Sequence, residues 1–298
     1  MPPIAVPHPI PYQGSKRQLA KAILARFPQS TLRLVEPFCG SAAISLAAIH
    51  AGQATELWLN DAHGPLIALW REIIDQPERL AAAYERLWNE QNGREREFFR
   101  EIRSTFNSSH QPHHFLYLLM RSVKAVIRYN SRGEFNNTPD NRRRGARPTD
   151  MRRRLLGASK LLRDRCLLTQ FDYTEVLARC TPGDLIYLDP PYQGVSRQAD
   201  QRYGPKVVHE RFCEELELLN QRGCRYLVSY DGRTGERSFG EPLPPSLGLV
   251  RLEIPAGRSS QATLLGRSQI TYESLYLSPG LIARLPRQKP SSLGRSFT

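Results

Sequence analysis

The chain has 298 residues and a formal net charge of +13, from 42 Lys plus Arg against 29 Asp plus Glu. This length suits one large α/β domain, or one such domain that carries a smaller inserted one. The composition excludes a membrane span, because no stretch approaches the ~18 apolar residues that a span needs, and the excess positive charge favours a polyanionic partner. A generally basic protein without such a partner is the alternative.

The five cysteines, at positions 39, 166, 180, 213 and 224, form no C-x-x-C pair and no spacing typical of zinc ligands. We therefore expect buried, reduced thiols and no bound metal. The N-terminus lacks a basic segment followed by an apolar one, as a secretion signal would have. A cytoplasmic protein with no membrane partner is the expectation.

The first 64 residues show the order of elements that begins a doubly wound sheet. A helix is predicted over residues 17–27 and a strand over 32–35, followed by a turn and a helix over 42–51. Gly52 stands where the residue after a helix C-cap belongs, and a second strand is predicted over 56–59. Strand, helix and strand in this order predict an α/β fold of the Rossmann-like type.

The strand signal disappears between residues 65 and 165. Helical periodicity takes over at 78–91, 94–106 and 114–129, which predicts a mainly helical insert. Strands are predicted again at 166–171, 185–188, 225–230, 249–254 and 270–277, with a helix over 210–221 between them. The tail over 281–298, rich in Pro, Ser, Arg and Leu, is expected to be poorly ordered.

The motif Asp189-Pro190-Pro191-Tyr192, after the apolar run of residues 185–188, carries the most specific chemistry in the chain. A nucleobase exocyclic amine is a poor nucleophile, because its lone pair is delocalised into the ring. Asp189 and a carbonyl of the proline pair can accept its two hydrogens and localise that lone pair. An ordinary turn that ends a strand is the alternative.

A second motif indicates a cofactor site. Glu36-Pro37-Phe38-Cys39-Gly40 places a small-residue turn between a strand and a helix, where a ligand can approach the backbone. Asp61 follows Gly40 by 21 positions, close to the ~20-residue interval at which an acidic strand end meets ribose hydroxyls. Together they outline a nucleoside-containing cofactor; a tight packing turn and a helix-capping Asp are the alternatives.

In this arrangement of motifs the chain resembles the DNA adenine-N6 methyltransferase (Dam-like) family, with the cofactor motifs before the recognition insert and the catalytic motif after it. The resemblance spans nearly the whole chain. It rests on five motifs in the right order: Tyr12-Gln13-Gly14-Ser15-Lys16, Glu36-Pro37-Phe38-Cys39-Gly40, Asn60-Asp61, residues 128–136, and Asp189-Pro190-Pro191-Tyr192.

The resemblance implies a doubly wound methyltransferase sheet from residues 1–64 and 166–280, a target-recognition insert over 65–165, and S-adenosylmethionine as the cofactor. It implies that Asp189 binds the target amine and Tyr192 the flipped base. The residues that it places around the cofactor are Tyr12, Lys16, Glu36, Phe38, Gly40, Asp61, Phe171, Asp172 and Tyr173.

Two positions depart from the family pattern. Ala42 stands where the family usually has a second glycine, and Ser15 stands in what is usually a Gly-Gly-Lys loop. Neither side chain adds charge or much bulk, so weaker cofactor binding is the most that we expect. A positive φ at either position would cost more.

Basic residues of the insert indicate a DNA-binding surface. The block of residues 142–154 is dense in arginine, which matches phosphate geometry; a solvated, disordered loop is the alternative, and DNA could also order such a loop. Specificity needs side chains that reach base edges. The predicted DNA-binding residues are Arg128, Asn130, Arg132, Asn136, Arg142, Arg143, Arg144, Arg147, Arg197 and Arg258. Arg197 lies in residues 193–207, which we expect to form a mobile loop over the extruded base.

The sequence therefore predicts site-specific methyl transfer to adenine N6 in duplex DNA after base flipping, with a separately encoded restriction endonuclease as a conceivable partner. Cytosine-N4 methylation poses the same electronic problem and stays open; Asp before the prolines favours adenine only by family resemblance. A DNA-binding module that kept the fold and lost the chemistry is a further alternative, against which Lys16, Asp61 and Asp189 argue.

Overall fold

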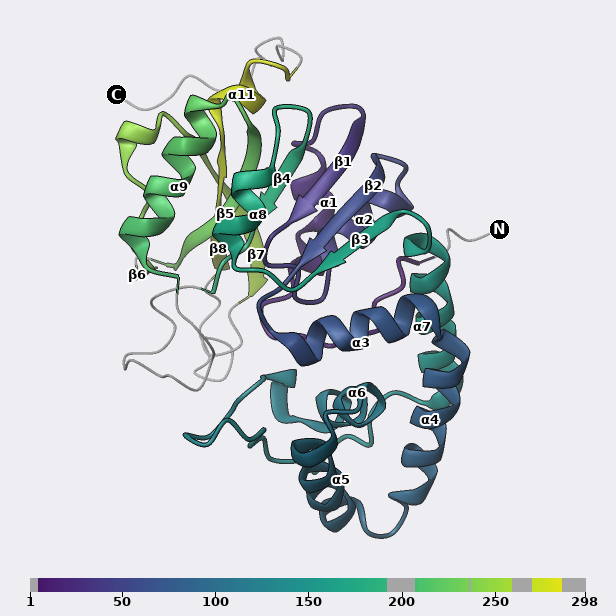
Figure 1. Cartoon of the computed structure of the whole chain (residues 1–298). Coiled ribbons are helices and arrows are strands. Elements are labelled where there is room, and N and C mark those ends of the chain that lie inside the picture. The colour runs from purple at the N-terminus through teal and green to yellow at the C-terminus, as the bar shows by residue number, and fades with distance from the viewer. Residues whose placement is uncertain (1–4, 192–206, 236, 259–269, 286–298) are drawn as a thin grey trace.

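The computed structural model describes residues 5–191, 207–235, 237–258 and 270–285. Its centre is one mixed sheet in the order β3-β2-β1-β4-β5-β8-β7, with β6 paired to β5 (Figure 1). β1 to β5 are mutually parallel, and β8 runs antiparallel to both β5 and β7. The strands are β1 Thr31–Glu36, β2 Ala54–Asn60, β3 Cys166–Thr169, β4 Leu185–Leu188, β5 Arg225–Thr234, β6 Arg237–Phe239, β7 Val250–Arg258 and β8 Ile270–Leu277.

Alternate residues of the central strands serve two separate hydrophobic cores, because successive side chains of a strand point to opposite faces. Leu34 and Leu185 pack on one side with α1 (Ala20–Leu24), α2 (Ala43–His50) and α3 (Gly64–Asp75). Val35 and Ile186 pack on the other with α8 (Tyr173–Arg179) and α9 (His209–Gln221). A sheet covered on both faces is the doubly wound arrangement predicted from the sequence, which is confirmed.

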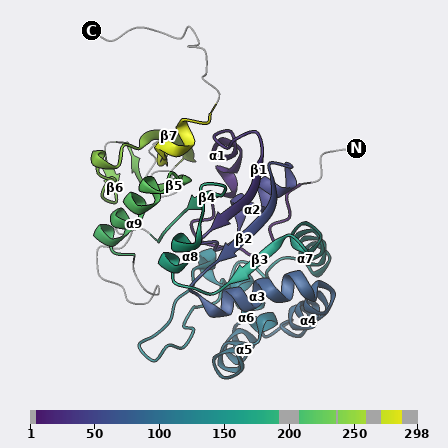
Figure 2. The ribbon, with the colours of Figure 1, turned by 45° about the horizontal axis from the view of Figure 1, so that its top comes forward.

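Between β2 and β3 the chain forms helices, among them α4 (Pro77–Glu90), α5 (Glu95–Ser109), α6 (Pro112–Arg121) and α7 (Pro148–Leu162). They gather beside the β3 edge of the sheet (Figure 2). Aromatic rings fill their interior; those of Phe106 and Phe115 stack with centroids 5.2 Å apart. The domain boundary at residue 65 stays a prediction, since α3 packs both on β3 and on α6.

Two helices are shorter than predicted. The helix expected over 114–129 ends at Arg121, where the chain passes through a 3-10 turn, η2 (Val123–Ala125). Lys124 and Ala125 both have positive φ, 57° and 49°, which a right-handed helix cannot contain. The helix expected over 17–27 is divided into η1 (Lys16–Gln18) and α1, with Leu19 between them.

The C-terminal part also differs from the prediction. Residues 279–282, expected in or beside a poorly ordered tail, form the short helix α11 (Pro279–Ile282), which Ser278 caps by accepting from the Leu281 N–H. Helices α3 and α8 and the short β6 were not anticipated. A 3-10 turn, η4 (Pro245–Leu247), precedes β7. Residues 286–298 and the loop expected over 193–207, apart from Val207, lie outside the described residues.

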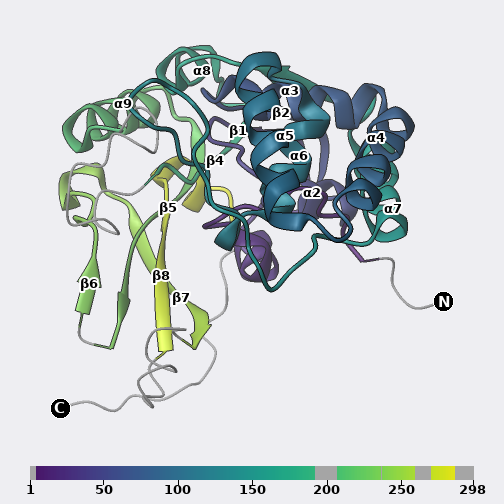
Figure 3. The ribbon, with the colours of Figure 1, turned by 90° about the horizontal axis from the view of Figure 1, so that it is seen from below.

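The strands β5, β7 and β8 extend beyond the helices as an arm (Figure 3). Their pairing shifts register twice, between Ser229 and Gly232 on β5 and between Pro255 and Gly257 on β7. Such bulges bend a ribbon and increase its twist. Both register shifts lie in the three strands that form this arm.

We predict that the turn before α2 stores backbone strain at Ala42, whose φ is +47° and whose side chain is fully buried. An L-residue in this left-handed region costs about 1–2 kcal/mol, which glycine avoids. Ala43, also buried, has ordinary helical geometry. Ala42→Gly and Ala43→Gly lose the same methyl group, so Ala42→Gly should have the higher free energy of unfolding by about 1–2 kcal/mol in urea titrations. Equal stabilities would exclude the strain.

Candidate functional site

The carboxyl end of β1 runs into a turn that is built around Gly40. Its φ of +47° suits glycine, and a Cβ added there would lie 3.1 Å from the ring of Tyr12. The Gly40 carbonyl accepts from Trp70 Nε1 of α3 (2.9 Å). Ser41 Oγ donates to Ser15 Oγ (2.9 Å), which joins the turn to the N-terminal loop. Ser15 has φ −53°, so this departure from the family pattern adds a hydrogen bond without strain.

Asp61, at the end of β2, holds that turn from the next strand. Its Oδ2 accepts from the Gly40 N–H and its Oδ1 from the His63 N–H, both at 3.0 Å. Each carboxylate oxygen has a second lone pair, so Asp61 can still accept from ligand hydroxyls. The acidic strand end and the glycine turn, which the sequence places 21 residues apart, therefore meet.

Asn60 is fully buried and joins three loops at this edge. Its Nδ2 donates to the carbonyls of Pro37 (3.0 Å) and Phe171 (3.1 Å), and its Oδ1 accepts from the Phe171 N–H and the Thr169 hydroxyl, both at 2.8 Å. All the hydrogen-bonding capacity of its amide is used. The loops after β1, β2 and β3 are thus held in one fixed arrangement.

Glu36 lies beneath the turn rather than on its surface. It is 2 % exposed and accepts from the Ser45 N–H at the start of α2 (2.5 Å). Burial raises the pKa of Glu36 to about 8, against the opposing effect of that hydrogen bond. The sequence predicts Glu36 as a cofactor-binding residue. In the structure its carboxylate accepts a hydrogen bond from the N-terminus of α2.

The segment of residues 171–173 reaches the same corner from β3. The rings of Phe38 and Tyr173 lie 5.1 Å apart, so the loops after β1 and β3 touch. Asp172 is exposed and caps α8 by accepting from the Thr174 N–H (3.0 Å). The guanidinium of Arg179 covers the ring of Phe171 at 4.5 Å. Phe38 and Phe171 both pack on the hydrophobic cluster that contains Tyr173, and these three residues are the aromatic group of this edge.

Asp189 directly follows β4 and forms an ion pair with Lys16 of η1, the Nζ lying 2.8 Å from Asp189 Oδ1. A second carboxylate, Glu273 of β8, lies 3.6 Å from the same Nζ. Burial alone would lower the pKa of Lys16, but Asp189 and Glu273 outweigh it and raise that pKa. Pro190 is buried and Pro191 exposed. Tyr192, predicted to bind the base, lies outside the described residues.

The loops after β1, β2 and β3, with Gly40, Asp61 and Phe171, form the corner of the sheet where the sequence predicts the cofactor (the cofactor corner), and His63 links this corner to the insert. Its Nδ1 accepts from the Leu66 N–H (3.2 Å) at the start of α3, so the ring proton is on Nε2, which donates to Tyr129 Oη (2.6 Å). Burial lowers the pKa of His63 to about 4. Sequence reasoning missed this residue; its position one before Gly64-Pro65, at a helix start, is the only signal.

Residues 128–136 form a tight hairpin closed by a bridge between Tyr129 and Phe135. Asn130, a predicted base reader, spends its side chain inside the turn: Oδ1 accepts from the Arg132 and Glu134 N–H groups, and Nδ2 donates to Glu134. Arg128, Arg132 and Asn136 are exposed. They stay candidates for DNA contact.

The arginine-rich block is held by contacts within the protein and leads into α7, so the alternative of a disordered loop is not supported. Tyr84 Oη donates to the Ala146 carbonyl (2.8 Å), and Gln91 Nε2 to that of Arg144 (3.1 Å). Four arginines form ion pairs: Arg143 with Asp140, Arg144 with Glu95, Arg152 with Glu78 and Arg153 with Asp150. Neither Arg142 nor Arg147 has an ion pair within the described part of the chain. Arg197 lies outside it, as does the side chain of Arg258, whose backbone ends β7.

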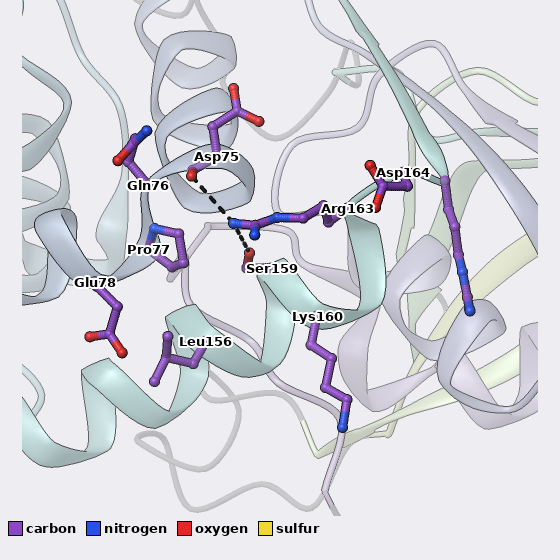
Figure 4. Close-up of a pocket in the computed structure, with 10 residues that line it drawn as sticks. Asp75, Gln76, Pro77, Glu78, Leu156, Ser159, Lys160, Arg163 and Asp164 are labelled. Atoms are coloured by element: carbon purple, nitrogen blue, oxygen red, sulfur yellow. Dashed lines mark hydrogen bonds between the residues drawn. The ribbon is translucent and has the colours of Figure 1, made fainter.

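A concavity of about 790 Å³ lies at the other end of the sheet, where α3 and α7 end and β3 begins (Figure 4). Arg163 crosses it and donates to the carbonyls of Ile74 (3.0 Å) and Asp75 (3.3 Å). These bonds satisfy helix-end carbonyls that would otherwise lack donors. The concavity is a joint between helices, and no predicted site residue lines it.

We predict a stability effect from His63 with a defined pH window. Its pKa is about 4 in the folded protein against 6.5 unfolded, so its contribution is complete above pH 6.5 and is lost as the pH falls towards 4. The contribution amounts to about 3 kcal/mol. His63→Asn, which can still cap α3, should show a correspondingly smaller loss of unfolding free energy between pH 7 and 4. Tyr129→Phe keeps the imidazole and should retain the wild-type pH dependence; an identical dependence in His63→Asn would contradict this assignment.

Within the described residues, no helix is long and apolar enough to cross a membrane. No group of three or more His, Cys, Asp or Glu side chains there is arranged to hold a metal ion.

Comparison with known proteins identifies DNA methyltransferases among the relatives of this chain. The chain is 25% identical over 277 residues to the type II methyltransferase M1.LlaDCHI of Lactococcus lactis subsp. cremoris, covering 87% of this chain and 91% of that protein. It is 30% identical over 189 residues to the retron Ec67 DNA adenine methylase of Escherichia coli, covering 61% and 62%. The family model of the D12 class N6 adenine-specific DNA methyltransferases matches residues 12–230. The chain belongs to that family, and it is a DNA methyltransferase specific for adenine N6.

Proposed function

We propose that Asp189 receives the target adenine amine at the edge where the cofactor turn, Asp61 and Lys16 converge. The observation that carries this is that one N-terminal segment contacts both groups. Ser15 Oγ accepts from Ser41 Oγ of the glycine turn (2.9 Å), and the next residue, Lys16, pairs with Asp189 (2.8 Å). The cofactor corner and the catalytic motif therefore share one space.

S-adenosylmethionine is the cofactor that we propose for this corner. Asp61 has free lone pairs for ribose hydroxyls, Gly40 leaves the backbone accessible, and the aromatic group of Phe38, Phe171 and Tyr173 offers apolar faces for an adenine ring. These residue types fit a nucleoside. When bound, the cofactor supplies a methyl group activated by a sulfonium. The chain's own residues supply position and charge.

Asp189 acts on the amine as an acceptor. Its carboxylate takes a hydrogen bond from N6–H, which draws the lone pair out of the ring and towards the donor. The Lys16 ammonium, 2.8 Å from Oδ1, holds that carboxylate in place by a charge-assisted hydrogen bond. A base inside a duplex cannot reach Asp189, so the adenine has to leave the stack, which costs a few kcal/mol.

The DNA-binding surface is proposed to combine the hairpin with the arginine-rich block. Arg128, Arg132 and Asn136 are exposed on the hairpin, where Arg132 pairs with Glu134 (3.0 Å). Arg142 and Arg147 are exposed without a carboxylate partner among the described residues. We expect arginines that already pair with carboxylates to contribute less to DNA binding, because a phosphate would first have to displace the carboxylate. The name of the lactococcal relative, a type II methyltransferase, suggests a separately encoded endonuclease as a partner.

The test of the function is to map modified bases in host DNA after expression of the chain. We expect N6-methyladenine within one short sequence, identified by nucleoside analysis and sequencing. N4-methylcytosine in its place would overturn the assignment to adenine. Loss of cleavage at that sequence by a matching endonuclease would support the partner.

Changing Asp189 to Ala should lower the rate of methyl transfer by roughly 10²–10³-fold or more, the effect of removing a group that stabilises developing charge. The fold should persist, because Asp189 is partly exposed and Glu273 remains near Lys16. Single-turnover transfer to duplex DNA measures the effect, with thermal unfolding as the check on folding. Asp75→Ala, at the far concavity, is the matched carboxylate control; wild-type turnover by the Asp189 variant would refute its role.

Arg142→Ala should weaken binding to DNA of any sequence and reduce the slope of log K against log[salt] by about 1, because one phosphate contact is lost. Arg152→Ala removes the same charge from an arginine already paired with Glu78, so its slope should change less. Fluorescence anisotropy titrations between low and moderate salt compare the two. Equal slopes for both variants would show that an ion pair with a carboxylate does not decide which arginines contact phosphate.

A further inference from the structure

We propose that Glu273 is a positioning residue for methyl transfer: it acts as a second counter-ion that keeps Lys16 buried while Asp189 turns an oxygen to the target amine. The inference rests on the proposed role of Asp189 and concerns a residue outside the motifs that identify the family. If so, a residue of β8, in the arm of the sheet, contributes to the reaction.

Three chain segments bring this group together. Lys16 lies in η1, Asp189 follows β4 and Glu273 lies in β8. The ammonium is 2.8 Å from Asp189 Oδ1 and 3.6 Å from Glu273 Oε2, and 4 % of the lysine side chain is exposed, against 21 % and 28 % for the carboxylates. The buried cation thus lies between two partly exposed anions.

The sheet is built to bring Glu273 to this place. β8 does not neighbour β4, since β5 lies between them. β5 has a bulge between Ser229 and Gly232, and Gly232 pairs with Glu273. A Cβ on Gly232 would lie 2.6 Å from the Tyr272 carbonyl oxygen, so no other residue permits this approach of β8.

The Lys16 ammonium also donates to the Gly14 carbonyl (3.1 Å), and its two ion pairs are unequal. A distance of 2.8 Å is a full charge-assisted hydrogen bond, whereas 3.6 Å is longer than a hydrogen bond but still strongly attractive at low dielectric. Burial raises the pKa of Glu273, and Lys16 acts in the opposite direction. Lys16 can therefore approach Glu273 when its contact with Asp189 lengthens.

This sharing matters when the amine arrives. With Asp189 as the only anion, any rotation of that carboxylate towards N6–H would leave a buried ammonium without a counter-ion, which is costly. With Glu273 in reach, the ammonium keeps a partner throughout. The benefit arises as the amine is engaged rather than when ligands bind, so it should affect kcat more than affinity.

The experiment is Glu273→Gln, which keeps the shape and removes the charge. We expect kcat to fall roughly 10- to 100-fold, as for a displaced catalytic group, while the dissociation constants of S-adenosylhomocysteine and of the target duplex change by less than about threefold. Glu253→Gln is the control: it lies on β7 in the same arm, pairs with Arg233 and should keep wild-type kcat.

An unchanged kcat, or equal losses in kcat and in cofactor affinity, would overturn the proposal. Should Glu273→Gln fail to fold, the same measurements are made on Glu273→Asp, whose shorter carboxylate lies farther from Lys16; wild-type kcat there would overturn it equally. The test of Glu273 needs only a wild-type enzyme that methylates an exocyclic amine, whichever base carries it. The test of the proposed function asks whether that amine is adenine N6. One of the two proposals can therefore fail while the other holds.

Discussion

The side chain of Asn60 is the interaction on which the functional edge depends. It is fully buried and satisfies backbone groups of the loops after β1 and β3 with one planar amide. Loops at a sheet edge otherwise take positions set by weak surface contacts. Here the Pro37 and Phe171 loops are fixed relative to each other, and the glycine turn, Asp61 and the aromatic group are fixed with them. Removal of the amide would leave several buried polar groups without partners, each costing about 1–3 kcal/mol.

The second constraint is electrostatic. The active edge contains a buried ammonium among carboxylates, an arrangement that burial alone opposes and that mutual attraction sustains. Such a cluster contributes little to the net free energy of unfolding. It does fix the positions of three charged groups relative to one another. In the proposed mechanism it places the Asp189 carboxylate where the target amine needs an acceptor. The proposed role of Glu273 would make the position of β8, and hence the bulge at Gly232, part of the same arrangement.

Much of this could be predicted from the sequence, because the signals are local. Buried strands of four to six apolar residues and a glycine turn define the sheet, and the order of motifs defines the family. Side-chain partners across the chain are not local. Nothing near Asn130 shows that its amide closes its own turn, and nothing near Arg144 or Arg152 shows that Glu95 or Glu78 is opposite. The contact of Glu273 with Lys16 likewise cannot be predicted without knowing that β5 pairs with β8.

The helix that ends early has the same kind of cause. The apolar periodicity of residues 114–129 continues past Arg121, yet the chain leaves the helix there: Ser122 is extended, and Lys124 and Ala125 then adopt positive φ. That break allows the hairpin of residues 128–136 to turn back, so that Tyr129 reaches His63. Local propensity favoured a longer helix, and tertiary contacts overrode it.

Residues 60 to 63 connect the end of β2 to the insert and also contact the neighbouring loops of the sheet edge. Asn60 serves the loops after β1 and β3, Asp61 holds the glycine turn, and His63 caps α3 and binds the hairpin. The insert thus begins at the cofactor corner, and its hairpin returns to that corner. Because Asp61 and His63 are also joined directly, through the His63 N–H, a shift of the hairpin is resisted by the groups that hold the cofactor turn. In the proposed mechanism, three residues of this short segment, Asn60, Asp61 and His63, therefore position both recognition and chemistry.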